Sequence, residues 1–153
     1  MQRNVKSNLL VCVLYNAGRK DELTLQTEER IIAGCSISQK LCFVGANTEL
    51  MKKFCSPNKV NIIAELNNCD DTIGNIREIK KFLDNNEYER VYIITHDYHQ
   101  RRVEHLLDYF KLNRNEVAVI PAESMLGIKN RKDFVEFFKL VYTLFLIKLK
   151  LIK

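Results

Sequence analysis

The stretch ITHDYHQRR, residues 94–102, gathers two histidines, an aspartate, a tyrosine and two arginines directly behind an apolar run. If Thr95 or Asp97 caps a helix here, His99 falls in its first turn, where the helix dipole disfavours imidazolium. Arg102 follows at i+3 and shares a face with His99. A neutral histidine beside an arginine at a helix N-terminus can cradle an anion or a phosphate. The competing interpretation is an ordinary strand-to-helix turn with a solvated first helical turn.

Other site chemistries find little support in the sequence. His96 and His99 are spaced i, i+3, but no third ligand stands at a suitable spacing, so no metal is expected. Neither G-x-G-x-x-G, nor a P-loop, nor G-x-S-x-G occurs. The five cysteines include no C-x-x-C pair, and several lie inside apolar runs, which predicts reduced core thiols.

The elements that must position these residues follow from an alternation of short apolar runs with longer amphipathic segments. Strands are predicted at residues 9–15, 41–44, 60–64, 91–94 and 117–120, and helices at 25–39, 48–54, 72–85, 98–111 and about 132–151. This alternation predicts a three-layer Rossmann-like α/β domain with a mostly parallel sheet of about five strands. The whole chain, 1–153, is expected to form one domain.

The composition and charge of the chain limit the classes of function that the sequence supports. Apolar content of 46% and charged content of 28% are ordinary for a soluble protein. The net charge of +5 is scattered along the chain, which disfavours nucleic acid as a partner. The apolar run near the N-terminus is too short for a membrane span, so a cytoplasmic protein is expected.

In such sheets, ligands bind beyond the carboxyl ends of the strands, where strand order reverses. The polar and small residues that follow the predicted strands are therefore the candidate ligand-binding residues: Asn16, Gly18, Arg30, Gly45, Thr72, Asn75 and Thr95. Structural alternatives remain for several of them. Arg30 can be a solvated helical arginine, Gly45 a turn glycine, and Asp71 or Thr72 a helix cap.

Taken together, these strand-end residues resemble the YdcF/SanA/ElyC group of bacterial proteins. The segments that carry the resemblance are LTLQTEER with Arg30, VGA with Gly45, DTIGN with Thr72 and Asn75, THDYHQRRV with Thr95, His99 and Arg102, and VIPAES with Pro121. They occur in the family's order and spacing, up to about Ser124. The chain departs from the pattern at Ala46, Asp71, Gly74 and His96, and Gly74 stands where the family has a glutamate.

The resemblance implies a Rossmann-like fold and binding of S-adenosylmethionine, or of another nucleotide or phosphorylated ligand, as in the soluble YdcF type. A second hypothesis is a phosphate- or pyrophosphate-ester hydrolase, in which His99 is the general acid or base and Arg102, with Arg30, neutralises developing charge. A third is a membrane-peripheral, envelope-related regulator that docks through its last helix.

The last segment, FVEFFKLVYTLFLIKLKLIK, is apolar on more than one helical face, and Glu136 and Lys139 interrupt it. The simplest interpretation is a terminal helix packed on the sheet. The alternatives are a homodimer interface and an interfacial helix whose lysines meet anionic lipid.

Overall fold

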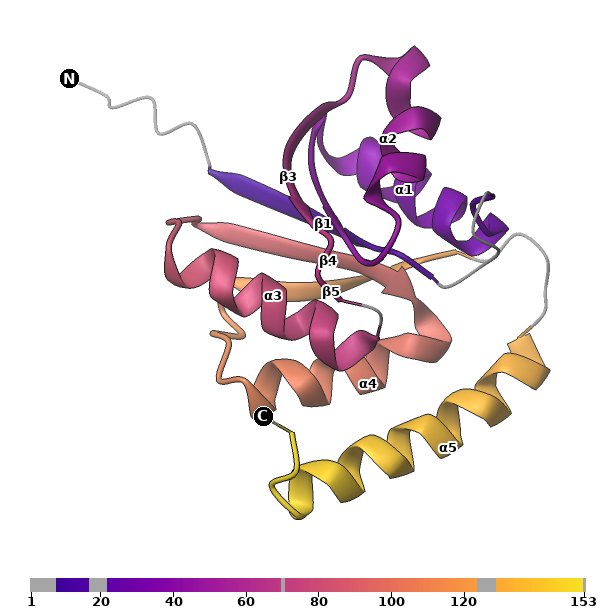
Figure 1. Ribbon diagram of the computed structural model, residues 1–153, viewed down its shortest axis with the longest axis vertical. Helices are drawn as coiled ribbons and strands as arrows, with labels where there is room; N and C mark the ends of the chain where they lie inside the picture. Colours follow the sequence, from indigo (N-terminus) through magenta and orange to yellow (C-terminus); the bar gives the residue numbers. More distant parts are fainter. Residues whose placement is uncertain (1–7, 17–21, 70, 124–128, 153) are drawn as a thin grey trace.

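The computed structural model describes residues 8–16, 22–69, 71–123 and 129–152, the last range without the side chains of residues 129–134. Five strands form one sheet: β1 (Leu9–Leu14), β2 (Lys40–Val44), β3 (Asn61–Leu66), β4 (Arg90–His96) and β5 (Val117–Ala122). The helices are α1 (Leu25–Ile37), α2 (Thr48–Cys55), α3 (Thr72–Asp84), α4 (Asp97–Tyr109) and α5 (Lys129–Lys148), and a short 3₁₀ turn, Ser56–Asn58, follows α2. All strand pairs are parallel. The predicted Rossmann-like α/β fold is confirmed (Figure 1).

Alternate residues of the strands feed two separate cores, one on each face of the sheet. Val11, Val13 and Phe43 pack with Ile31 of α1 and Met51 of α2. The intervening strand residues, such as Leu10 and Cys12, pack with apolar residues of α3 and α4. Because strand side chains alternate between faces, runs that are apolar at every position are expected in a sheet covered on both sides.

The strand order, β3-β2-β1-β4-β5, reverses direction at β1. The chain first moves outward from β1 to β2 and β3, and then crosses back to β4 on the other side of β1. The carboxyl ends of β1 and β4 therefore lie side by side, with crossover connections that leave in opposite directions. This is the place where α/β sheets of this type form a ligand crevice.

Strand β4 runs two residues further than predicted. Thr95 and His96 pair with Pro121 and Ala122 of β5, and α4 begins at Asp97. His96, and neither Thr95 nor Asp97, therefore holds the N-cap position. The extension places Thr95 on the α3–α4 face and His96 on the α1 face, since successive strand residues alternate.

Helix α5 packs against α4, which separates it from the sheet (Figure 1). The predicted packing on the sheet is therefore wrong. The physical reason is that α3 and α4 already cover that face with Ile76, Ile79 and Leu106, which are fully buried. In the parts of the chain that the structure describes, no helix has both the length and the apolar content needed to cross a bilayer.

Gly45, at the end of β2, has a φ of +134°, and a β-carbon there would lie 2.4 Å from Cβ of Tyr15. Both facts require glycine, because other residues are strained at this φ and the neighbouring atoms belong to a chain segment adjoining β1. Packing against Tyr15 therefore accounts for Gly45 without a ligand.

We expect Gly45→Ala to lower the free energy of unfolding by about 2–4 kcal/mol, from backbone strain together with overpacking. Urea unfolding measures this, with Ile32→Ala, on the exposed side of α1, as the control. A loss no larger than that of the control would show that the strand end accommodates a side chain.

Candidate functional site

Four side chains from three helices meet beside the carboxyl end of β4; they are Thr72 of α3, His99 and Arg102 of α4, and Glu136 of α5, and we call them the Arg102 cluster. Nη2 of Arg102 donates to Oγ1 of Thr72 at 2.9 Å. Oγ1 of Thr72 lies 3.2 Å from Nε2 of His99. Oε2 of Glu136 lies 2.9 Å from Nδ1 of His99 and 3.3 Å from Nη2 of Arg102.

Nδ1 of His99 lies between Oε2 of Glu136 at 2.9 Å and Nη2 of Arg102 at 2.8 Å. Because a carboxylate can only accept, the hydrogen bond to Glu136 belongs to the tautomer that carries its proton on Nδ1, and we adopt that tautomer. The Thr72 hydroxyl accepts from Arg102 and is free to donate its own proton to Nε2. The result is a neutral imidazole with an acceptor directed at a hydroxyl, held between a carboxylate and a threonine.

Burial is the main reason that the pKa of His99 is lowered to about 4; the hydrogen bond to Glu136 opposes this shift, and the nearby charges of Arg102 and Arg30 add to it. The neutral histidine predicted from the helix dipole is thus present, with burial as the main cause. Burial alone would raise the pKa of Glu136, but the hydrogen bond from His99 and the charges of Arg102 and Lys139 lower it to about 2. Glu136 is therefore an anion at neutral pH.

A second group, the Arg30 cluster, lies on the α1 face of the same sheet edge. Nε of Arg30 donates to Nδ1 of His96 at 3.0 Å, and Nη1 donates to the carbonyl of Leu14 at 3.0 Å. Nε2 of His96 lies 2.7 Å from Oε2 of Glu29. Arg30 is only 2% exposed, so it is not the solvated helical arginine that its helix would ordinarily suggest. Burial lowers its pKa, and its charge is held by these acceptors.

Several buried polar atoms at this edge find no hydrogen-bond partner in the described part of the chain. They are Oδ1 of Asn75, Oγ1 of Thr95 and Nε of Arg102, and a fourth, Nε of Arg77, lies further along α3. Asn75 follows Thr72 by one helical turn and is 6% exposed, and Thr95 is fully buried. Unpartnered buried polar atoms are costly, so a cluster of them is expected where a ligand or water completes the bonding.

A pocket of about 290 Å³ opens beside the Arg102 cluster, between α4 and α5. It is lined by Asp97, Tyr98, Arg101, Arg102, Glu136, Phe137 and Leu140. A larger hollow of about 770 Å³ lies at the opposite edge of the sheet, around Asn8, Glu89 and Glu116. We favour the smaller pocket, because Arg102, whose Nε is unpartnered, lines it, whereas no residue with an unpartnered buried atom lines the larger one.

The remaining predicted site residues are placed as follows. The backbone of Asn16 is bound by the Thr27 hydroxyl, at 3.0 Å to its N–H and 3.3 Å to its carbonyl, which fixes the chain as it leaves β1. Thr24 caps α1 and also contacts Thr27, so these two hydroxyls shape the loop. Gly45 packs on Tyr15. Gly18 lies outside the described residues.

The sequence-based reasoning missed two carboxylates, Glu29 and Glu136. Both are buried, at 5% and 7% exposure, and each binds a histidine of the sheet edge. A signal for Glu136 was available, because it is an acid within a run that is otherwise apolar apart from lysines. A β-carbon at Gly74 would lie 2.9 Å from Cβ of Cys69, so close packing against Cys69 accounts for this glycine.

No family model, curated protein or solved structure matches the chain. Among the described residues, no group of three or more histidine, cysteine, aspartate or glutamate side chains is placed to hold a metal ion.

The pKa of His99 predicts a pH-dependent stability. Unfolded, the ring binds a proton near its ordinary pKa of 6.5, whereas in the folded protein it does so only near pH 4. The unfolded state therefore gains protons first as pH falls, and this contribution to stability is lost between about pH 6.5 and pH 4. Between pH 7.5 and pH 4, the wild type should lose about 2–3 kcal/mol more than His99→Gln. Denaturant unfolding at each pH measures the difference. Parallel pH profiles for the two proteins would contradict a buried neutral His99.

Proposed function

We propose that the chain binds an anionic small molecule at the carboxyl edge of the sheet, in the pocket between α4 and α5 that Arg102 and Glu136 of the Arg102 cluster line. The single observation that carries this proposal is the set of buried, unpartnered polar atoms at the reversal of strand order.

The unpartnered atoms indicate which hydrogen-bonding groups a ligand would need. Nε of Arg102 needs an acceptor, whereas Oδ1 of Asn75 needs a donor, and Oγ1 of Thr95 can take either. A ligand with an anionic group close to an N–H or O–H group supplies both. The amino-acid end of S-adenosylmethionine has this chemistry, and so do the phosphate and ribose groups of a nucleotide. The pocket of about 290 Å³ is near the lower limit for ligand sites, roughly 300–1,000 Å³, and suits such a head group.

Glu136 is the main competitor for the ligand. Its carboxylate already contacts His99 and Arg102, so an incoming anion either displaces it or binds to Nε of Arg102, which has no partner among the described residues. Lys139, which lies 3.1 Å from Oε1 of Glu136, offsets part of the repulsion between the two anions. Binding is therefore expected to be coupled to a small displacement of α5.

A second candidate function is hydrolysis of a phosphate or pyrophosphate ester, and a specific geometry favours it. The order Glu136, His99, Thr72 repeats the relation of carboxylate, imidazole and hydroxyl that activates nucleophiles on unrelated folds. In this version His99 takes the proton from the Thr72 hydroxyl or from a bound water, Glu136 stabilises the imidazolium, and Arg102 faces the charge that develops on oxygen.

For the binding function, Arg102→Ala should weaken affinity by about 1.5–3 kcal/mol, the cost of a charge-assisted hydrogen bond. Isothermal titration calorimetry with S-adenosylmethionine, ATP and inorganic pyrophosphate measures the loss. Arg90→Ala is the matched control, since Arg90 is an exposed arginine at the first residue of β4, away from the pocket. Equal affinities for the Arg102 variant and the wild type, or no binding of any probe, would refute the proposal.

For the hydrolase function, His99→Gln should reduce turnover by about 10²–10⁴-fold while affinity changes little. Assays with p-nitrophenyl phosphate and pyrophosphate measure turnover, and His105→Gln, exposed on the same helix, is the control. A wild type without turnover on these esters removes the hydrolase candidate and leaves the binding function.

A further inference from the structure

The outer surface of α5 concentrates the exposed apolar side chains of the protein. Of the twelve large apolar side chains that are exposed in the described part of the chain, nine lie between Val135 and Leu151. Phe138 is 56% exposed, Tyr142 62% and Phe145 55%. Exposed apolar surface gathered on one helix is typical of an interaction site.

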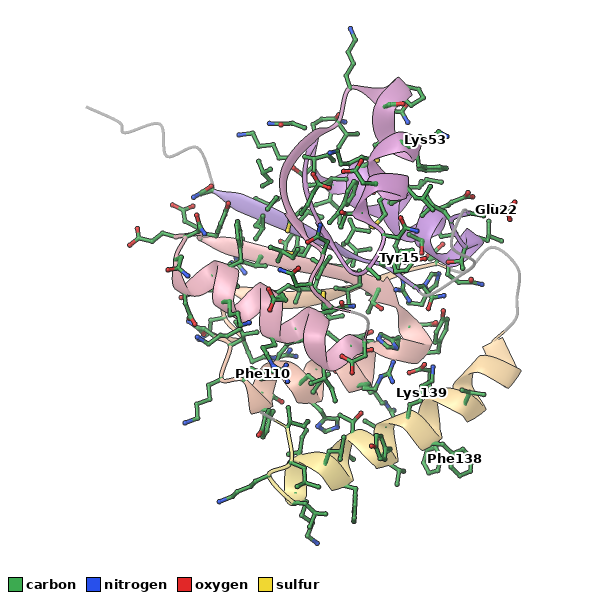
Figure 2. The ribbon with its side chains drawn as sticks, in the orientation of Figure 1. Tyr15, Glu22, Lys53, Phe110, Phe138 and Lys139 are labelled. Atoms are coloured by element: carbon green, nitrogen blue, oxygen red, sulfur yellow. The ribbon has the colours of Figure 1, made fainter. Side chains whose placement is uncertain are left out.

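The polarity of α5 is inverted relative to an ordinary surface helix. Glu136, which contacts His99 and Arg102 of α4, and Thr143 are buried, whereas Phe138 and Phe145 are exposed. Figure 2 shows Phe138 on the side of α5 away from the sheet, and Lys139 on the side toward the domain. At 3.6 residues per turn, the outward apolar residues span an arc of roughly 200°, about twice the stripe of a core-facing helix.

The charges on this surface indicate what covers it. Residues 137–153 contain no aspartate or glutamate, and of their four lysines Lys139 pairs with Glu136 on the side toward the domain. Lys148 lies within the apolar arc and is exposed, and Lys150 is exposed just after the helix. Lysine can extend its stem along apolar surface and place its ammonium among head groups. A second copy of the chain would bring further lysines to this surface and no carboxylate to pair with them.

The polar contacts of the inner face fix the orientation of α5. Glu136 binds His99 and Arg102, and Tyr109 of α4 donates to the carbonyl of Ile152, so both ends of the described segment are tied to α4. A helix held lengthwise against the domain can present its apolar arc to a flat surface. We propose that the outer face of α5 docks on a bilayer surface rich in anionic phospholipid.

The test is flotation of the full chain with vesicles of phosphatidylcholine alone, or of phosphatidylcholine and phosphatidylglycerol in equal parts. We expect flotation with the anionic vesicles. Phe138→Ser/Phe145→Ser and Lys148→Glu/Lys150→Glu should each weaken it at least about tenfold. The matched controls are Ile32→Ser on α1 and Lys40→Glu/Lys53→Glu, whose side chains are exposed elsewhere on the molecule and should leave flotation unchanged.

Any of three results would overturn the proposal. They are no flotation of the chain with anionic vesicles, equal flotation with both kinds of vesicle, and a loss of flotation in the control variants as large as that in the α5 variants. Light scattering on the same proteins identifies the alternative occupant. A dimer that Phe138→Ser/Phe145→Ser dissociates, without vesicle binding, would assign this surface to a second copy.

Discussion

The reversal of strand order at β1 is the constraint on which the candidate site depends. It brings the ends of β1 and β4 together and sends their connections to opposite faces, so polar groups from α1, α3 and α4 converge on one edge. Two arginines are buried or nearly buried there, and each requires acceptors. Arg30 finds its acceptors in His96 and the carbonyl of Leu14, and Arg102 finds Thr72 and Glu136. The two clusters differ at Nε of the arginine. Nε of Arg30 donates to His96, whereas Nε of Arg102 has no partner among the described residues.

The two buried histidines illustrate how neighbouring groups set protonation. His96 accepts from Arg30 through Nδ1 and faces Glu29 with Nε2, so its proton resides on Nε2. His99 has the opposite arrangement, with its proton on Nδ1 toward Glu136 and its Nε2 toward the Thr72 hydroxyl. Nε2 of His99 thus faces the Thr72 hydroxyl, whereas the two nitrogens of His96 contact an arginine and a carboxylate. This difference makes His96 a structural residue in our account and His99 a functional one.

The fold was predictable from the sequence because the strands are short, mostly apolar runs and the helices are periodic. That Thr72, Asn75, Thr95, His99 and Arg102 lie near one edge of the sheet was also predictable, since they stand at the end of β4 or in the first two turns of the helices that follow β3 and β4. The partners of these residues were not predictable, because Glu29 and Glu136 come from helices whose packing depends on tertiary contacts. For Gly45, the sequence suggested a role in ligand binding, because a glycine at a strand end allows a ligand to approach closely. In the structure, Gly45 packs against Tyr15 instead. The spacing of residues along the sequence predicts which of them share one face of a helix or strand. Contacts between elements that are distant in the sequence are seen only in the three-dimensional structure.

The central claim is that an anion binds at the Arg102 cluster, and the imidazole nitrogens of His99 report on it most directly. Nitrogen-15 NMR of the histidine side chains, recorded during titration with pyrophosphate, separates His99 from the exposed His105 on the same helix. The account predicts a saturable shift of Nδ1 and Nε2 of His99 as Glu136 is displaced, with His105 unchanged. Unchanged His99 signals at high pyrophosphate, or equal shifts of His99 and His105, would contradict an anion site at this edge of the sheet.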